Sequence, residues 1–99
     1  MWKIIKLECL LNYNNLQNVV LKAYWEYTIS QDNEQETISG IKQFTAPSED
    51  NFIPYENLTE QIVLDWLWKE ISKQATEELA IKKLNDKINP PIISLSLPW

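Results

Sequence analysis

The sequence has no histidine, and it contains a single glycine and a single cysteine among its 99 residues. Histidine is the commonest general base near neutral pH and a common metal ligand, so most acid–base and metal chemistry lacks its usual residue here. One glycine is too few for a glycine-rich loop that binds phosphate groups. We therefore expect a protein that is not an enzyme, with no catalytic site, no metal site, no cofactor and no small-molecule substrate.

Arginine is also missing: all nine basic residues are lysines, and the net charge is −5. Arginine makes the bidentate contacts to phosphate and guanine that nucleic-acid recognition commonly uses, and such recognition needs a positively charged surface. The fourteen acidic residues lack the spacing of a calcium-binding loop and are typical of a solvated surface. We expect no nucleic-acid partner.

Long apolar runs are absent as well. No stretch approaches the ~20 apolar residues that a membrane-spanning helix needs, so we expect no membrane contact. The opening residues MWKIIKLECLL lack a small-residue cleavage site and alternate like a strand, which does not resemble a signal peptide. Cys9 has no partner for an internal disulfide and alternates with Leu7 and Leu11, so we expect a buried thiol in an intracellular or assembled protein.

Tryptophan, in contrast, is abundant, with five residues. Trp25 falls in an alternating stretch and Trp66 on the main face of a helical stretch, and both positions favour core packing. Trp68 lies off that helical face, and Trp2 and Trp99 lie near the ends of the sequence. Because tryptophan is enriched at interface hot spots, we expect these three residues to contact another chain.

Alternating apolar and polar residues predict three half-buried strands. The alternating stretches are residues 2–13, 19–30 and, more weakly, 36–44. In the first stretch the predicted apolar face consists of Ile5, Leu7, Cys9, Leu11 and Tyr13. Polar clusters at residues 14–18 and 30–36 predict the connecting loops. Gly40 predicts a bulge in the third strand, whose weak pattern indicates an edge position.

The stretch Leu58–Ile71, LTEQIVLDWLWKEI, has the periodicity of a helix. Thr59 is expected to cap its N-terminus, with Leu58 and Val63 at the positions of a hydrophobic staple. The stretch is apolar around well over half of its circumference, beyond the roughly 100° arc that covers one surface, so we expect burial on two sides. A second helical stretch begins near Thr76 with its apolar stripe out of phase, which predicts two helices with a tight joint.

Together these patterns predict an α+β fold in a single domain over residues 1–99. A three-stranded antiparallel β-meander (2–45) is followed by a crossover loop (46–58) and two helices (59–88) that pack against the sheet. An extended segment, residues 89–99, follows the helices and is called the C-terminal segment below.

Two segments outside the predicted strands and helices are unusually apolar. Phe52, Ile53 and Tyr55 make the crossover loop too apolar for a free linker, so we expect it to be pinned to the body. In the C-terminal segment, apolar residues alternate with serine or proline at Ile93, Leu95, Leu97 and Trp99. Such a segment should dock, either on its own sheet or by adding a strand to a neighbouring subunit, and the sequence leaves both open.

Three pieces of the chain resemble a known family when taken in order: NFIPYENLTEQIVLDWLW (Asn51–Trp68), NPP (Asn89–Pro91) and LPW (Leu97–Trp99). They look like an uncharacterised family of small proteins encoded by tailed phages, especially cyanophages and related marine phages. The resemblance covers the second half of the chain, and the first half matches only in character. The sequence departs from the family pattern at Ser72–Gln74, where members often have a glycine.

The resemblance implies a phage protein but supplies no activity. We therefore expect a virion structural protein, such as a tail, baseplate, connector or capsid-associated component, assembled in the host cytoplasm. Its expected partners are other phage structural proteins or further copies of itself. The alternative is a small non-virion phage protein that binds and redirects a host protein. The candidate partner-binding residues are Trp2, Trp68, Ile93, Leu95, Leu97 and Trp99.

Overall fold

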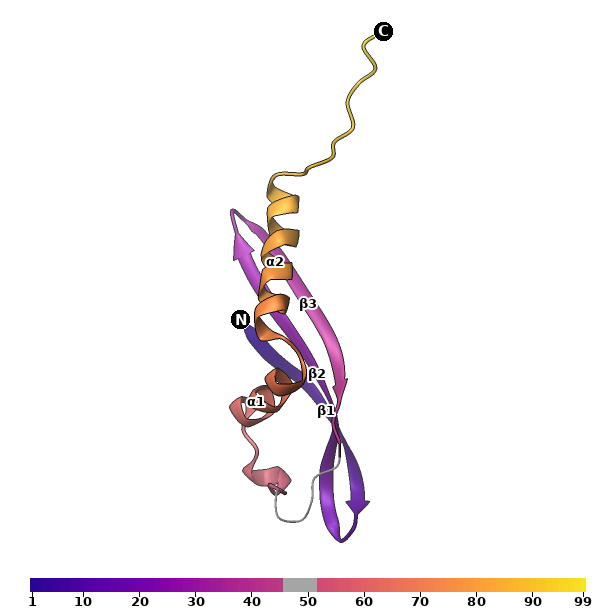
Figure 1. Cartoon of the computed structure of the whole chain (residues 1–99), viewed down its shortest axis with the longest axis vertical. Helices are drawn as coiled ribbons and strands as arrows, with labels where there is room; N and C mark the ends of the chain where they lie inside the picture. The colour runs from indigo at the N-terminus through magenta and orange to yellow at the C-terminus, as the bar shows by residue number, and fades with distance from the viewer. Residues whose placement is uncertain (46–51) are drawn as a thin grey trace.

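The computed structural model describes residues 1–45 and 52–99 and has a three-stranded antiparallel sheet followed by two α-helices (Figure 1). The elements are β1 (Trp2–Tyr13), β2 (Leu16–Gln31), β3 (Glu34–Gln43), the 3-10 turn η2 (Tyr55–Asn57), α1 (Glu60–Glu70) and α2 (Lys73–Ile88). The predicted α+β fold is confirmed. Of the predicted crossover loop, residues 46–51 lie outside the described residues.

Two-residue turns join the strands in the order β1-β2-β3. Asn14 and Asn15 have φ of 46° and 68°, and Asp32 and Asn33 have φ of 53° and 64°. Positive φ at both central residues is what a type I′ hairpin turn requires, and asparagine and aspartate tolerate it better than other residues with a side chain. The strands therefore pair right up to each turn.

The loops predicted at residues 14–18 and 30–36 are therefore too long, because each turn contains only two residues. The error arose because polar residues such as Gln17 and Glu34 were assigned to loops, whereas they continue the strands. The first hairpin projects beyond the helices and is solvated on both faces, so no apolar alternation marks its strand ends. Beside the second turn, Gln35 and Glu36 meet Lys87 of α2 through polar contacts, so apolar alternation is missing there too.

Replacing Asn33 by valine is expected to destabilise the protein by about 1–2 kcal/mol, because a β-branched side chain strains a backbone with positive φ. Urea denaturation monitored by tryptophan fluorescence measures the change. Gln31→Val is the matched control, since Gln31 is an exposed position of β2 where valine suits the strand. Equal stability of the two variants would contradict a type I′ turn.

Two bulges lie between β1 and β2. Ile4 pairs with Trp25 and Lys6 with Tyr24, so Ile5 has no partner across the sheet, and a second register shift follows Glu8. Across the first bulge Ile4, not Ile5, joins the apolar face, and Ile5 is 51% exposed. The predicted apolar face of β1 is therefore wrong at Ile5, and also at Leu11 and Tyr13, which are exposed.

Gly40 pairs with Trp25 in an unbroken β2–β3 register, so the bulge predicted at Gly40 is wrong. The glycine is required for another reason. A Cβ at this position would lie 2.7 Å from Cζ2 and 2.9 Å from Cε2 of the Trp25 ring, closer than real Cβ contacts allow. The missing side chain thus makes room for the indole on the apolar face of the sheet.

The N-termini of both helices are capped by hydroxyl side chains. Thr59 accepts a hydrogen bond from the Ile62 amide at 3.2 Å, as predicted, and Ser72 accepts one from the Ala75 amide at 3.0 Å. The predicted joint is confirmed, although α2 begins at Lys73 rather than near Thr76. The chain passes between the helices through Ile71 and Ser72 in extended conformations, so the turn needs no positive φ and no glycine.

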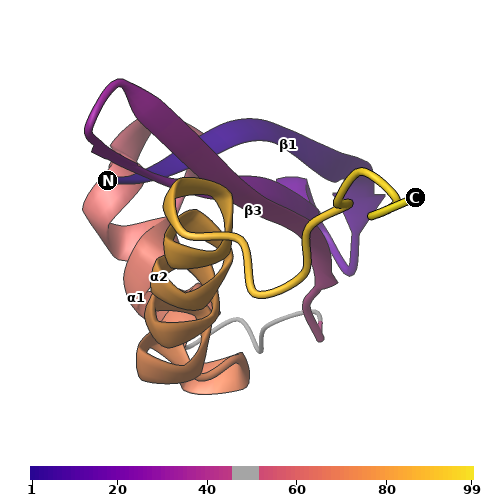
Figure 2. The ribbon, with the colours of Figure 1, turned by 90° about the horizontal axis from the view of Figure 1, so that it is seen from above.

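Both helices lie on one side of the sheet (Figure 2). The buried apolar residues are Val19, Val20, Ala23, Trp25, Val63, Leu64, Leu67, Ala80 and Leu84. Trp25, Leu64 and Leu67 form the centre of the core, and Leu67 is fully buried. Trp25 thus has the core position predicted for it.

Candidate functional site

The C-terminal segment is the most exposed apolar part of the described chain. It has no regular secondary structure and runs away from the body beyond the end of α2 (Figure 1). Its exposed apolar side chains, with their exposed fractions, are Ile92 (87%), Ile93 (65%), Leu95 (78%), Leu97 (69%) and Trp99 (91%). Within this single chain the segment pairs with neither β1 nor β3.

The composition of the C-terminal segment suits protein contacts. Residues 88–99 carry no charged side chain, and Pro90 and Pro91 hold the backbone extended where it leaves the helix. Exposed apolar surface of this kind is a liability on an isolated protein and marks interaction sites. Sequence reasoning named four of its apolar residues and missed Ile92, because Ile92 breaks the strict alternation.

The root of the C-terminal segment is fixed to the sheet by Lys87 near the end of α2. Its Nζ donates a hydrogen bond to the Gln35 carbonyl at 2.6 Å and pairs with the Glu36 carboxylate at 2.8 Å. Both acceptors lie near the start of β3, so the last turn of α2 is tied to the second hairpin. The direction in which the segment leaves the body is thereby set.

The Lys87 ion pair lowers the pKa of Glu36, chiefly through the hydrogen bond that Lys87 donates. A lowered pKa in the folded state contributes stability above the unfolded-state pKa of about 4.3, and this contribution is lost as the pH falls through the folded-state pKa. We expect Glu36→Gln to reduce the loss of melting temperature between roughly pH 5 and 3, the range in which carboxylates titrate.

Thermal unfolding of both proteins across that range measures the effect. Glu34→Gln is the matched control, because Glu34 is an exposed neighbour in the same strand. If acidification lowers the melting temperatures of the native protein and of Glu36→Gln by the same amount, the ion pair does not form in solution.

Trp2 and Trp68, two of the predicted partner-binding residues, contact each other within the same chain. Their ring centroids are 5.7 Å apart, and Trp2 also stacks beside Trp25 at 5.4 Å. The indole of Trp2 donates a hydrogen bond to Glu77 at 2.9 Å, and Lys73 lies 4.4 Å from the centroid of the Trp68 ring. These contacts give both rings packing partners within the chain. The C-terminal segment is therefore the better candidate for a contact with another chain.

Sequence reasoning missed an apolar cleft of about 260 Å³ beside Trp66, which we call the Trp66 cleft. Its lining residues are Asn18, Val19, Val20, Phe44, Thr45, Phe52, Ile53, Leu58, Trp66, Lys69 and Glu70. The rings of Phe44 and Trp66 meet edge to face with centroids 6.0 Å apart. Trp66 was expected to be a core residue, but it is half-buried and forms a wall of this cleft.

The Trp66 cleft explains why α1 is apolar on more than one side. Its buried residues Val63, Leu64 and Leu67 form one side, and Trp66 faces the cleft. Phe52 and Ile53 are half-buried on the cleft wall, which agrees with the expectation that this part of the crossover is pinned, whereas Tyr55 is 43% exposed. No sequence signal could locate the cleft, because its lining comes from segments far apart in the chain.

The free edge of β1 is less suited to docking. The bulge at Ile5 interrupts its regular pairing pattern, and the Ile4 amide donates a hydrogen bond to the Glu60 carboxylate at 3.2 Å. Bulges and side chains that occupy edge groups are devices that prevent strands from adding to an edge. Between the two surfaces, the Trp66 cleft is the better receptor for an apolar partner.

Other kinds of site are not apparent in residues 1–45 and 52–99. Within these ranges no three Cys, Asp or Glu side chains gather in a way that could hold a metal ion. None of the described helices is long and apolar enough to cross a membrane.

The described chain is thus an α+β domain whose distinctive surfaces are an exposed apolar segment and an apolar cleft. It belongs to the family described as domain of unknown function DUF7936, whose family model matches residues 1–99. Comparison with curated proteins and with solved structures finds no match.

Proposed function

We propose that this protein is a structural component of a phage particle and that it acts through contacts with neighbouring protein subunits. A tail, baseplate, connector or capsid-associated position each agrees with this role. Its location would be the virion, after assembly in the host cytoplasm. The phage origin rests on the resemblance of Asn51–Trp68, Asn89–Pro91 and Leu97–Trp99 to the phage family described above.

The observation that carries the proposal is the exposure of the C-terminal segment. Its five apolar side chains are between 65% and 91% exposed, and the segment makes no strand with its own sheet. At about 25 cal/mol per Å², covering such side chains provides a strong driving force for association. A subunit in an assembly would bury them against its neighbour, and particle components are subunits of this kind.

Quantitative mass spectrometry of purified phage particles tests the proposal. The expected result is that the protein is present at a fixed ratio to the major capsid protein, and that ratio gives its copy number. A protein that is absent from particles but abundant in infected cells would overturn the proposal. That outcome would favour the alternative, in which the same apolar segment binds a host protein.

A further inference from the structure

We propose that the Trp66 cleft receives the C-terminal segment of a second copy of this chain, which produces a head-to-tail assembly. This inference deepens the proposed function, on which it rests, by naming the neighbour and the receiving surface. The cleft is defined by the lining residues given above, and the incoming side chains are those of Leu95, Leu97 and Trp99.

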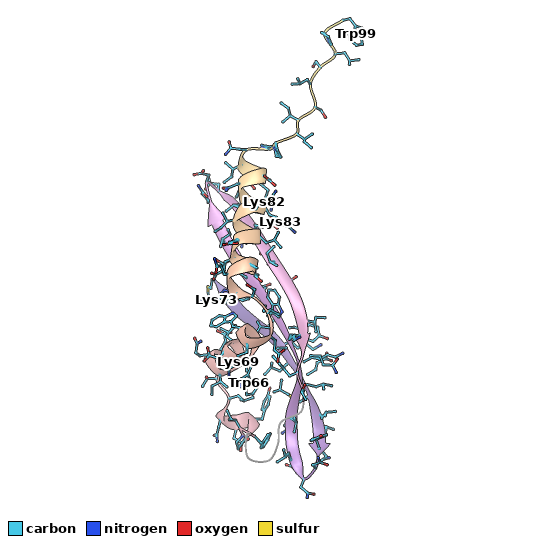
Figure 3. The ribbon with its side chains drawn as sticks, in the orientation of Figure 1. Trp66, Lys69, Lys73, Lys82, Lys83 and Trp99 are labelled. Atoms are coloured by element: carbon cyan, nitrogen blue, oxygen red, sulfur yellow. The ribbon has the colours of Figure 1, made fainter. Side chains whose placement is uncertain are left out.

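The two surfaces lie in different parts of an elongated molecule. The principal dimensions are 74 × 22 × 19 Å, and the C-terminal segment forms one extremity of the long axis. Trp66 and Lys69 lie in the other half, below α2, whereas Trp99 is the most distant labelled residue (Figure 3). Copies stacked along this axis would bring the segment of one copy toward the cleft of the next.

The chemistry of the segment matches that of the cleft. The described lining consists mainly of apolar and aromatic side chains, and the two charged residues among the described lining residues, Lys69 and Glu70, are of opposite sign. The incoming segment has no charged side chain, so its side chains bring no ion that would need a buried partner. A peptide with apolar, uncharged side chains is therefore a better occupant than one with charged side chains.

The size of the cleft also favours a peptide anchor. Its volume of about 260 Å³ is below the roughly 300–1,000 Å³ of sites that enclose small ligands. A hollow of this size suits one or two large side chains, and Trp99 is the largest in the segment. Aromatic anchors in pockets commonly supply most of the binding free energy of an interface.

To occupy the cleft of its own chain, the segment would have to turn back along the whole of α2. The cleft borders the end of α1, and the 16 residues of α2 separate it from the segment by about 24 Å. Eleven extended residues span at most about 36–40 Å, so a returning segment would spend more than half of its length beside α2. It would also have to reverse direction at Pro90 and Pro91, which favour an extended path.

A contact between two different surfaces of identical chains has a consequence for symmetry. Each copy offers one segment and one cleft, so every added copy leaves another cleft open for the next. Between copies stacked in parallel, such heterologous contacts generate a closed ring or an open filament, whereas a reciprocal exchange of segments in a two-fold dimer would require antiparallel copies. Rings and stacked repeats are the forms that this contact would contribute to a particle.

Light scattering after size-exclusion chromatography tests the inference on purified full-length chains. The native protein is expected to form species larger than a dimer, in proportions that rise with concentration. Trp99→Ala, which removes the anchor, and Ile53→Glu, which places a charge in the cleft, are each expected to be monomeric. When mixed, the two variants should form a heterodimer and stop there, because Trp99→Ala supplies an intact cleft and Ile53→Glu an intact segment.

Ser96→Ala is the matched control in the segment, and Ile81→Ser is the control for loss of an exposed apolar side chain elsewhere, on α2. Both should assemble like the native protein. Circular dichroism verifies that Ile53→Glu is folded, and Phe52→Ser provides a second cleft variant. A native protein that stays monomeric up to its solubility limit, a closed native dimer, or a Trp99→Ala protein that still assembles would each overturn the inference.

The light-scattering result and the result of mass spectrometry on particles are independent of each other. A protein found in particles but monomeric in solution would overturn head-to-tail self-assembly and leave the structural role standing, with a different subunit as neighbour. A protein that assembles in solution but is absent from particles would retain the contact and overturn the structural role.

Discussion

Replacing Trp25 by alanine is expected to lower the free energy of unfolding by about 3–5 kcal/mol, a large part of the roughly 5–15 kcal/mol available to a domain. Trp25 is only 8% exposed and packs with Leu64 and Leu67 at the centre of the core. Its removal leaves a cavity between the sheet and α1. For a domain of this size each kcal/mol lowers the melting temperature by about 4–8 °C, so the loss amounts to tens of degrees.

Chemical denaturation measures the effect, and Trp99→Ala is the matched control. The same substitution at a side chain that is 91% exposed should change stability by no more than about 0.5 kcal/mol when the protein is dilute enough to be monomeric. A Trp25→Ala protein as stable as Trp99→Ala would contradict the placement of the core.

The contact of Trp25 with Gly40 makes a sharper test possible. Gly40→Ala alone should cost about 1–3 kcal/mol, since the added methyl group collides with the indole. In the Trp25→Ala background the same change should cost little, because the ring is gone. The two substitutions are therefore expected to be non-additive, and strict additivity would show that the residues do not touch.

Much of the fold could be predicted because its signals are local. The alternation of β2, the hydroxyl cap at Thr59 and the phase slip before α2 each depend on neighbouring residues, and each corresponds to an element of the structure. The turns could not be bounded, because Asn14–Asn15 and Asp32–Asn33 lie within longer polar runs. The helices do not cover the first hairpin, and α2 meets the second one through the polar contacts of Lys87, so both hairpin ends lack the apolar alternation of the inner strand parts.

The bulges and the cleft could not be predicted because they depend on contacts between distant segments. A register shift at Ile5 changes which side chains face the helices, and nothing in the local pattern marks it. Gly40 was correctly singled out as a special position, but its reason is the indole across the sheet. Trp68 was expected to contact another chain, and helical periodicity could not show that Trp2 of β1 would lie beside its ring.

The C-terminal segment was the most predictable part of the candidate site. Its alternation, its two prolines and its lack of charge are all local features, and the structure leaves its apolar residues exposed. What the sequence left open was whether the segment docks on its own sheet or on a neighbour. In the single chain it does not join the sheet, so its removal is expected to affect assembly rather than folding.

Deletion of residues 92–99 is expected to abolish incorporation of the protein into particles while leaving its body folded. The deletion removes Ile92, Ile93, Leu95, Leu97 and Trp99, none of which is less than 65% exposed. Loss of side chains that contact no core residue should change the stability of the purified monomer by at most about 0.5 kcal/mol. Loss of the docking anchors, in contrast, removes the interface contacts that carry most of the binding free energy.

The measurement is complementation of a phage that lacks the native gene, followed by mass spectrometry of purified particles and thermal unfolding of the purified variant. A full-length chain with Ser94→Ala and Ser96→Ala is the control, because it alters the same segment but keeps every apolar anchor, and it should be incorporated normally. A truncated protein found in particles at the native ratio would show that the segment is dispensable. Truncation that also unfolds the body would show instead that the segment supports its own chain, because a docking segment is needed by the assembly and not by the fold.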